Sequence, residues 1–227
     1  MDDLKATQYF SSSIGDYMKA IWQLVGSGVA STSDVSEQLS VAPASVTRML
    51  GRLQEMDLVR YERYRGASLT EKGRLEALRL VRRHRLIETF LLEHLGYSWQ
   101  EVHDEAERLE HAVSDGFTER LADFLGHPEH DPHGEPIPAA DGTLTVEDSR
   151  PLSEVEVGDR VLISKVSDEN SSMLDYLGER GLVPGQLLMI KEVRQVDDVV
   201  TVEDEAGEVY SIGEPLARSV FVRIASA

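Results

Sequence analysis

The sequence contains no cysteine among its 227 residues. Disulfide bonds, thiolate zinc sites and cysteine nucleophiles are therefore excluded, and any metal centre must use oxygen and nitrogen ligands. The sequence also lacks a run of about 18 apolar residues, the length that a membrane-spanning helix needs. Its first ten residues, MDDLKATQYF, lack the apolar segment of a secretory signal. We therefore expect a cytoplasmic protein with no membrane segment.

Net positive charge is also missing, because the formal net charge is −18. Residues 1–75 hold nine basic and nine acidic side chains, so the remaining residues carry the whole excess of negative charge. Such a total disfavours nucleic-acid binding by the chain as a whole. A neutral N-terminal part with clustered arginines can still bind DNA phosphates.

The N-terminal part has the pattern of a winged helix-turn-helix. Apolar periodicity predicts three helices, over Ile14–Leu24, Thr32–Leu39 and Pro43–Met56. An S-x-x-D cap at Ser31 and a proline at the first turn support the starts of the second and third helices. Two β-type segments, Val59–Arg63 and Ala67–Thr70, predict a hairpin wing. The alternative is a small helical core with solvated arginines.

Polar side chains on the third helix and on the wing are candidates for contact with DNA. Hydroxyl and guanidinium groups at the start of a recognition helix suit base edges and phosphates. Arginines along a wing can follow a phosphate backbone. The predicted DNA-binding residues are Ser45, Thr47, Arg48, Arg52, Arg63 and Arg65.

Three further helices are predicted over Glu71–Leu95, Trp99–Ser114 and Asp115–Leu125. Their apolar side chains exceed what one small domain buries. We therefore expect a homodimer, because paired half-sites multiply the specificity of a DNA-binding regulator.

The second of these helices carries the segment VHDEAERLEHAVS, in which four potential ligands fall at i, i+4, i+7 and i+8: His103, Glu107, Glu110 and His111. On one continuous helix this spacing places all four on one stripe. Imidazoles and carboxylates on one stripe are suitable ligands for a divalent cation. The alternative is a solvated face with ordinary ion pairs. His84 and Glu88 form another i, i+4 pair of the same kind, and the histidine-containing loop His127–Gly142 is long enough to reach over a metal site.

The C-terminal part predicts a small barrel of the SH3 type, with a short helix over Ser172–Arg180. Its five strands are expected over Arg160–Val166, Leu187–Val193, Val199–Val202, Val209–Ile212 and Val220–Ile224. The fold class is therefore mainly α with a small β domain. We expect a winged helix-turn-helix over residues 1–75, a helical metal-binding and dimerisation domain over 76–146, and the SH3-like domain over 147–227. The sequence has no phosphate loop or nucleophile triad, so we do not expect an enzyme.

Several segments together resemble the diphtheria toxin repressor family of metal-dependent transcriptional regulators, including its manganese-responsive branch. The segments are IGDYMKAIWQL, APASVTRMLGRLQEMDLV, YRGASLTEKG, RRHRLIETFL, HDEAERLEHAVSD and DPHGEPIP. The part that begins VGDRVLISKV is similar to the FeoA domain of long family members. The resemblance covers essentially the whole chain.

The resemblance implies a primary metal site formed by Asp16, Glu107, Glu110 and His111. Iron-type members have Met and Cys at the positions of Asp16 and Glu107, whereas both residues are carboxylates here. Hard oxygen donors favour Mn(II), with Fe(II) as the alternative. One departure is Lys19, because the short manganese regulators have a glutamate there. This difference argues against a two-metal cluster of their kind.

The resemblance also implies an ancillary metal site, for which two ligand sets compete. Iron-type members would use His84, Glu88 and His103. Streptococcal manganese regulators would use Glu88, Asp131, His133 and Asp168. The sequence does not decide between them.

We therefore expect a repressor of manganese or iron uptake genes that binds double-stranded operator DNA. Glu107 and Glu110 are expected to repel each other and Asp16 until a metal ion binds and fixes the dimer geometry for DNA. Two alternatives are a winged-helix regulator that responds to an organic ligand and a metalloenzyme or metal-storage protein. The second leaves the recognition helix and the arginine wing unexplained.

Overall fold

The computed structural model describes residues 11–24, 28–145, 147–167, 171–194 and 196–225. Its contacts divide the chain into two compact units. Unit 1 consists of residues 1–84, 107–124 and 138–144, and unit 2 of residues 85–106, 125–137 and 145–227. No helix in the described ranges is long and apolar enough to cross a membrane.

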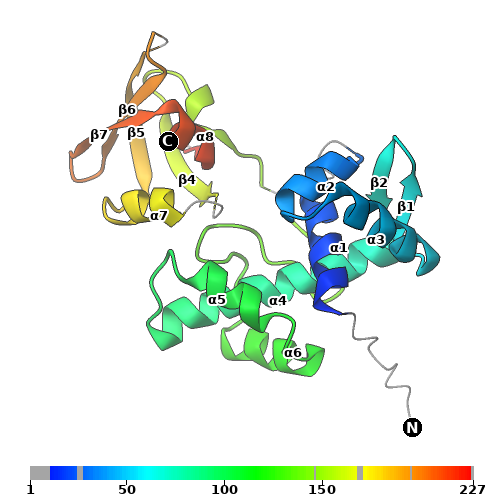
Figure 1. Ribbon diagram of the computed structural model, residues 1–227. Helices are drawn as coiled ribbons and strands as arrows, with labels where there is room; N and C mark the ends of the chain where they lie inside the picture. The colour runs from blue at the N-terminus through cyan, green and yellow to red at the C-terminus, as the bar shows by residue number, and fades with distance from the viewer. Residues whose placement is uncertain (1–10, 25–27, 146, 168–170, 195, 226–227) are drawn as a thin grey trace. The chain divides into compact units, whose positions relative to one another are not determined.

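Unit 1 begins with three helices and a hairpin, which confirms the predicted winged helix-turn-helix (Figure 1). They are α1 (Ser12–Leu24), α2 (Thr32–Gln38), α3 (Pro43–Glu55), β1 (Val59–Glu62) and β2 (Gly66–Leu69). The predicted cap of α2 is present, since Ser31 Oγ accepts a hydrogen bond of 3.1 Å from the Asp34 amide. Pro43 lies in the first turn of α3, where its missing N–H is not needed.

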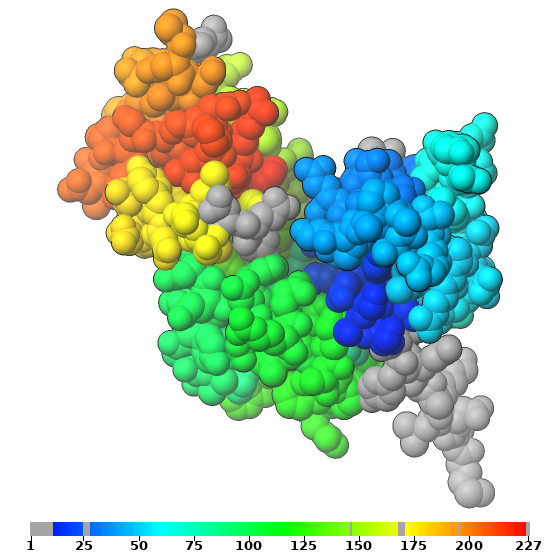
Figure 2. Space-filling model, in the orientation of Figure 1, coloured from blue at the N-terminus to red at the C-terminus, as the bar shows by residue number. Residues whose placement is uncertain are grey.

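Apolar side chains from α1, α2, α3 and the hairpin form one core, which includes the fully buried Met18, Ile21, Leu50 and Leu53. The hairpin is antiparallel, with Val59 opposite Leu69. Ala30 adds a third strand-like pairing through two backbone hydrogen bonds of 2.8 Å to Ala67. Gly66 is required there, because a Cβ atom would lie 2.4 Å from the Ala30 carbonyl oxygen. Figure 2 shows the hairpin in cyan, at the edge of the N-terminal helices.

The middle helices are α4 (Glu71–Leu95), α5 (Val102–Leu109) and α6 (Asp115–Phe124). The predicted helix over Trp99–Ser114 is wrong at both ends, so Glu110 and His111 lie in a turn after α5. Helix α5 ends earlier than predicted because Arg83 contacts the residues that follow it. Arg83 Nη1 donates to the Glu110 carbonyl oxygen at 2.9 Å, and its Nη2 pairs with Asp115 at 2.7 Å. These bonds hold the chain as it turns into α6.

Unit 2 contains a six-stranded antiparallel sheet in the order β3-β8-β4-β5-β6-β7 (Figure 1). The strands are β3 (Arg150–Pro151), β4 (Arg160–Val166), β5 (Leu187–Arg194), β6 (Val199–Asp204), β7 (Val209–Gly213) and β8 (Val220–Ile224). The helical elements are η2 (Leu152–Glu154), α7 (Ser171–Gly178) and α8 (Glu214–Ser219). The five predicted strands are confirmed, whereas β3 and α8 were not predicted. Valine, leucine and isoleucine side chains fill the interior.

Within unit 2, the segment 131–135 is attached to strand β4. The Val166 amide donates to the His133 carbonyl oxygen at 2.8 Å. Lys165 Nζ pairs with Glu135 at 2.8 Å. At Gly134 the backbones are so close that a Cβ atom would lie 2.1 Å from the Ser164 carbonyl oxygen. The three consecutive domains expected from the sequence stay a prediction. The two compact units do not test them, because each unit combines several separate stretches of the sequence.

Candidate metal centres and DNA-binding surface

Three side chains of unit 1 form what we call the Asp16 cluster: Asp16 on α1, with Glu110 and His111 in the turn after α5. Each offers a ligand atom, and these atoms lie within 4.8 Å of one another. His111 Nε2 is 2.7 Å from Asp16 Oδ1 and 3.4 Å from Glu110 Oε1. The cluster therefore joins the first helix of the winged helix-turn-helix to the turn between α5 and α6.

A second group, the His84 cluster, adjoins the first and shares Glu110 with it. Its members are His84 on α4, Glu107 on α5, and Glu110. His84 Nδ1 lies 2.6 Å from Glu110 Oε2 and 3.9 Å from Glu107 Oε1. The Asp16 and His84 clusters together bring all four predicted primary ligands into one region of unit 1.

Lys19 extends from α1 into the His84 cluster. Its Nζ lies 3.1 Å from Glu110 Oε2 and 3.3 Å from His84 Nδ1, and it contacts Glu107 Oε1. The expected repulsion between Glu107 and Glu110 is therefore relieved by an ammonium group of the chain itself. The sequence reasoning did not place Lys19 in the site. The available signal was its i, i+3 spacing from Asp16, which puts both residues on one face of α1.

The charges in this region shift the pKa values of its groups. Burial alone would lower the pKa of Lys19, but the carboxylates of Glu110 and Glu107 outweigh burial and raise it. Burial alone would raise the pKa of Glu110, but hydrogen bonding to His84 and the charge of Lys19 lower it. The hydrogen bond to Asp16 raises the pKa of His111. Glu110 is thus held as an anion beside the ammonium group of Lys19.

The Asp16 cluster fits a divalent cation, as one unsatisfied atom indicates. Glu110 is fully buried, and no hydrogen bond from the described part of the chain reaches its Oε1. A buried carboxylate oxygen without a hydrogen bond is costly and calls for a physical explanation. Oε1 faces His111 Nε2, close to Asp16 Oδ1, so a cation bound by these three atoms would satisfy it.

Two features of the sequence allow His111 to approach Asp16. Gly15 precedes Asp16 on α1, and a Cβ atom at this position would lie 2.9 Å from His111 Cε1. Glycine is therefore needed for the imidazole to lie against the helix. Arg83 fixes the other side by holding the Glu110 carbonyl oxygen.

Unit 2 contains a separate group, the Glu88 cluster, formed by the buried side chains of Glu88, Asp131 and His133. His133 Nε2 lies 3.0 Å from the Trp99 carbonyl oxygen, so Nε2 carries the proton that is donated to it. Nδ1 then keeps its lone pair, and among the described residues it has no hydrogen-bond partner. Such an arrangement sets the tautomer of a metal-binding histidine.

Asp131 is oriented by its neighbours. Its Oδ1 accepts hydrogen bonds from the amides of His133 at 2.9 Å and Glu135 at 3.0 Å, and its Oδ2 lies 3.4 Å from Arg85 Nε. The Glu88 cluster thus contains three members of the manganese-type ancillary set. The fourth, Asp168, lies outside the described residues.

The iron-type ancillary set overlaps this cluster at Glu88. His103 Nδ1 lies 3.1 Å from Glu88 Oε1 within unit 2. His84 precedes Glu88 by one turn of α4, and its Nδ1 is directed at Glu110 and Lys19 in unit 1. The choice between the two ancillary sets stays a prediction.

The predicted DNA-binding residues all lie in unit 1, on α3 and at the wing turn. Thr47, Arg48 and Arg52 are exposed on α3, whereas Ser45 is half-buried. Thr47 Oγ1 donates to the Pro43 carbonyl oxygen at 3.1 Å. At the wing, Arg65 pairs with Glu62 at 3.1 Å and Arg63 packs over the Tyr64 ring. The roles of these residues in DNA binding stay predictions.

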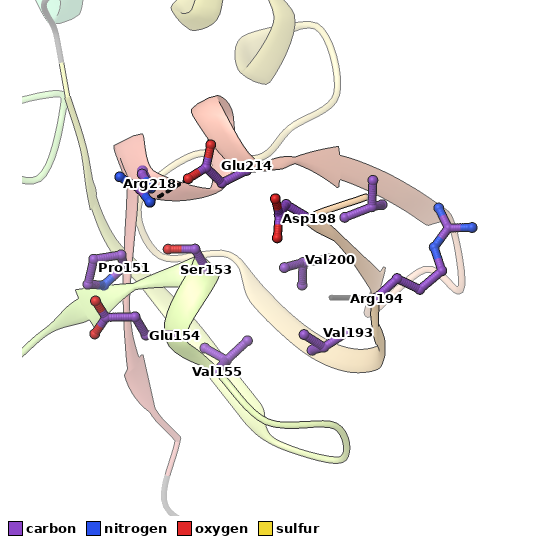
Figure 3. Close-up of a pocket in the computed structure, with 11 residues that line it drawn as sticks. Pro151, Ser153, Glu154, Val155, Val193, Arg194, Asp198, Val200, Glu214 and Arg218 are labelled. Carbon is purple, nitrogen blue, oxygen red and sulfur yellow. Dashed lines mark ion pairs between the residues drawn. The ribbon is translucent and has the colours of Figure 1, made fainter. Parts of the chain in front are cut away.

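A cavity of about 700 Å³ lies in the C-terminal barrel, apart from these clusters (Figure 3). Its lining includes Val155, Val193 and Val200, and an ion pair of 2.5 Å between Arg218 and Glu214. None of the predicted metal-binding or DNA-binding residues that the structure describes lines it.

Three family models match the chain in succession. Residues 9–67 match the N-terminal DNA-binding domain of iron-dependent repressors. Residues 70–139 match the metal-binding and dimerisation domain of the same repressors. Residues 150–224 match the FeoA domain.

Named relatives are similar over about half of the chain. Iron-dependent repressor IdeR of Mycobacterium tuberculosis is 37% identical over 123 residues, which are 54% of this chain and 54% of IdeR. The match therefore spans about half the length of that relative. The HTH-type transcriptional regulator MntR of Bacillus subtilis is 38% identical over 120 residues, which cover 52% of this chain and 84% of MntR.

Solved structures match over more of the chain. A manganese-dependent transcriptional repressor in complex with manganese has 36% identity and a TM-score of 0.87, covering 93% of this chain and 100% of its own. ScaR with bound Cd²⁺ has 32% identity and a TM-score of 0.80, and the match covers 93% of this chain and 99% of ScaR. These relatives and the three domain matches agree with the motifs of the sequence. The chain therefore belongs to the diphtheria toxin repressor family of metal-dependent transcriptional regulators.

Proposed function

We propose that this protein is a metal-dependent transcriptional repressor that binds double-stranded operator DNA as a homodimer. The single observation that carries the proposal is the Asp16 cluster, in which the buried Glu110 Oε1 faces Asp16 and His111 without a hydrogen bond from the described residues. The relatives give no support to a regulator that responds to an organic ligand, and the names of IdeR and of the manganese-dependent repressor refer to iron and manganese.

The ligand chemistry supports Mn(II) as the cofactor, with Fe(II) as the alternative. The proposed primary ligands are Asp16, Glu107, Glu110 and His111, which offer carboxylate oxygen and imidazole nitrogen but no sulfur. Such donors suit Mn(II) and Fe(II) better than soft metal ions. The proposed ancillary site is the Glu88 cluster, with His84, His103 and Asp168 as the further candidates.

The switch would act through the position of α1. Asp16 is on α1, which packs in the same core as α3, whereas Glu110 and His111 are in the turn before α6. A divalent ion at this centre would supply the positive charge that holds these three ligands and Glu107 together. Asp16 then ties α1 to the turn, and the position of α3 relative to the dimerisation helices is fixed. The size of the effect is limited by the preference of the ion for the DNA-binding state.

The DNA contacts proposed for this state come from α3 and the wing. Ser45, Thr47, Arg48 and Arg52 would face the major groove, and Arg63 and Arg65 would contact backbone phosphates. Binding should therefore weaken steeply with salt. Repression of manganese or iron uptake genes follows from the family and is part of the proposal.

The test is DNA binding over a metal series, with duplexes selected from a random pool in the presence of Mn(II). We expect the wild-type protein to bind in Mn(II) and to release the DNA in EDTA. Asp16→Ala should need at least about tenfold more Mn(II) for the same binding, which corresponds to about 1.4 kcal/mol. Asp104→Ala is the control, because Asp104 is exposed on α5. DNA binding that EDTA does not change, or equal Mn(II) requirements for Asp16→Ala and wild type, would contradict the proposal.

A further inference from the structure

We propose that Trp99 is a positioning residue of the Glu88 cluster, where its indole N–H and its backbone carbonyl together orient Asp131 and His133 for a divalent ion. Trp99 lies in unit 2, in the turn between α4 and α5, and is not itself a candidate ligand. Two hydrogen bonds between Trp99 and the segment 131–135 are the observation behind the proposal. The inference rests on the proposed ancillary site and names the residue that orients its ligands.

The indole group of Trp99 holds the peptide group that links Pro132 to His133. Trp99 Nε1 donates a hydrogen bond of 2.8 Å to the Pro132 carbonyl oxygen. The amide of the same peptide group, which belongs to His133, donates to Asp131 Oδ1 at 2.9 Å. Because a trans peptide group is planar, its carbonyl and its amide can turn only together. The bond from Trp99 therefore also fixes the amide that orients the carboxylate of Asp131.

The backbone carbonyl of Trp99 acts on the imidazole of His133 directly. His133 Nε2 donates its proton to this oxygen at 3.0 Å, and the fully buried side chain keeps Nδ1 free of hydrogen bonds from the described residues. The indole and imidazole rings also lie against each other, with their centroids 5.2 Å apart. Turning the imidazole over would break the bond to the carbonyl. Trp99 thus sets which nitrogen of His133 is available to a metal ion.

Trp99 is itself held by the barrel. Its side chain packs against the apolar core of the barrel. A Cβ atom added at Gly178, the last residue of α7, would lie 3.4 Å from Trp99 Cε3. The residue that orients two of the proposed ligands is therefore anchored in the barrel, so the orientation of these ligands depends on the packing of the barrel.

The first experiment compares Trp99→Phe with Trp22→Phe as the matched control. Phenylalanine at position 99 keeps an aromatic ring and the backbone carbonyl but has no N–H to donate to Pro132. Trp22 is the other tryptophan of the chain and lies on α1, in the core of unit 1. Both changes are made in the full chain with Asp16→Ala, which leaves the Glu88 cluster as the proposed centre that calorimetry with Mn(II) measures. We expect Trp99→Phe to weaken this binding roughly 10- to 100-fold and Trp22→Phe to leave it unchanged.

The second experiment needs no metal. Heteronuclear NMR of the two imidazole nitrogens of His133 reports the tautomer, at a pH where the ring is neutral. We expect the proton on Nε2 in the wild-type protein and a mixture of both tautomers in Trp99→Phe, because the segment 131–135 has lost one of its anchors. A residue that only fills space would change stability without changing the tautomer. Circular dichroism checks folding, and the wild-type tautomer tests the inference even if Trp99→Phe does not fold.

The outcomes separate this inference from the proposed ancillary site. If adding His133→Ala to the Asp16→Ala chain leaves Mn(II) binding unchanged, the ancillary site is wrong and the role of Trp99 falls with it. If binding depends on His133 but Trp99→Phe keeps the affinity of its parent, only the role of Trp99 is overturned. Weaker binding with an unchanged tautomer overturns it as well, because Trp99 would then act through packing alone. A proton on Nδ1 in the metal-free wild-type protein has the same consequence.

Discussion

Glu110 is fixed by three neighbours, which hold two of its atoms. Arg83 holds its carbonyl oxygen at 2.9 Å, and His84 and Lys19 hold Oε2 at 2.6 and 3.1 Å. These contacts leave Oε1 directed at His111. The orientation of the proposed ligand is therefore set before metal binds, so little conformational entropy is lost on binding.

Gly15→Ala tests whether His111 must lie against α1 to bind metal. A methyl group at this position would overlap His111 Cε1 and approach Leu80 Cδ1 to 3.0 Å. Alanine would otherwise stabilise the helix by up to about 1 kcal/mol. We expect the affinity for Mn(II), measured by calorimetry, to fall about tenfold, or about 1.4 kcal/mol.

Gly51→Ala on α3 is the control, because no atom lies within 4 Å of its added Cβ. It should keep the Mn(II) affinity of the wild-type protein and gain slightly in melting temperature. Equal affinities for the two variants would argue against His111 as a ligand.

Local sequence signals predicted most elements well, and failures occurred where distant residues decide the structure. The start of α2 follows from Ser31 and Asp34, which are three residues apart. The end of α5 depends on Arg83, which is 27 residues from Glu110, and no glycine or proline marks it in the sequence. Strand β3 has only two residues and is defined by its pairing with β8. Its sequence therefore carries no strand pattern.

Helix α6 has two exposed phenylalanines seven residues apart, on one face of the helix. Phe117 is 46% exposed and Phe124 is 64% exposed. The match to a dimerisation domain includes α6, so we predict that this face contacts the second subunit. Phe124→Glu should raise the dimer dissociation constant at least about tenfold, as expected from loss of about 1.4 kcal/mol. Sedimentation equilibrium measures the change.

Val157→Glu provides the comparison for the α6 variant. Val157 is 62% exposed and lies outside α6, so this variant should keep the mass of the wild-type protein. A dimer that is unchanged in Phe124→Glu would place the interface elsewhere.

At the scale of the whole chain, the attachment of segment 131–135 to the barrel can be tested at Gly134. Gly134 has a φ of +87°, and its Cβ would overlap the Ser164 carbonyl oxygen. Gly134→Ala should lower the free energy of unfolding by about 1–2 kcal/mol for the backbone conformation and by about 1–3 kcal/mol more for overpacking. Urea unfolding followed by Trp99 fluorescence, in a Trp22→Phe background, reports on unit 2.

Gly207→Ala separates the two contributions. Gly207 has nearly the same φ, +85°, but no atom lies within 4 Å of an added Cβ. It should show only the backbone cost of about 1–2 kcal/mol. If both variants lose the same stability, the segment and the barrel are not tightly packed in solution.

The candidate sites were less predictable from sequence than the fold. Asp16 and His111 are 95 residues apart, and only the family resemblance linked them. The sequence shows that Lys19 replaces the glutamate of the short manganese regulators. Its spacing from Asp16 indicates only that both residues lie on one face of α1, not which residues Lys19 contacts. Whether its long side chain reaches Glu107 and Glu110 depends on how α1 packs against the turn after α5. The attachment of His133 to Val166 is a contact between backbone groups, which no side-chain pattern reveals.

The hydrogen bond from the Val166 amide to the His133 carbonyl oxygen limits which substitutions strand β4 can accept during evolution. A backbone bond does not depend on which side chains the two residues carry. The surface of β4 can therefore accumulate substitutions while the barrel remains joined to the segment that supplies Asp131 and His133. Proline is the exception at position 166, because it has no amide hydrogen to donate. Proline should therefore be the substitution that evolution avoids at position 166.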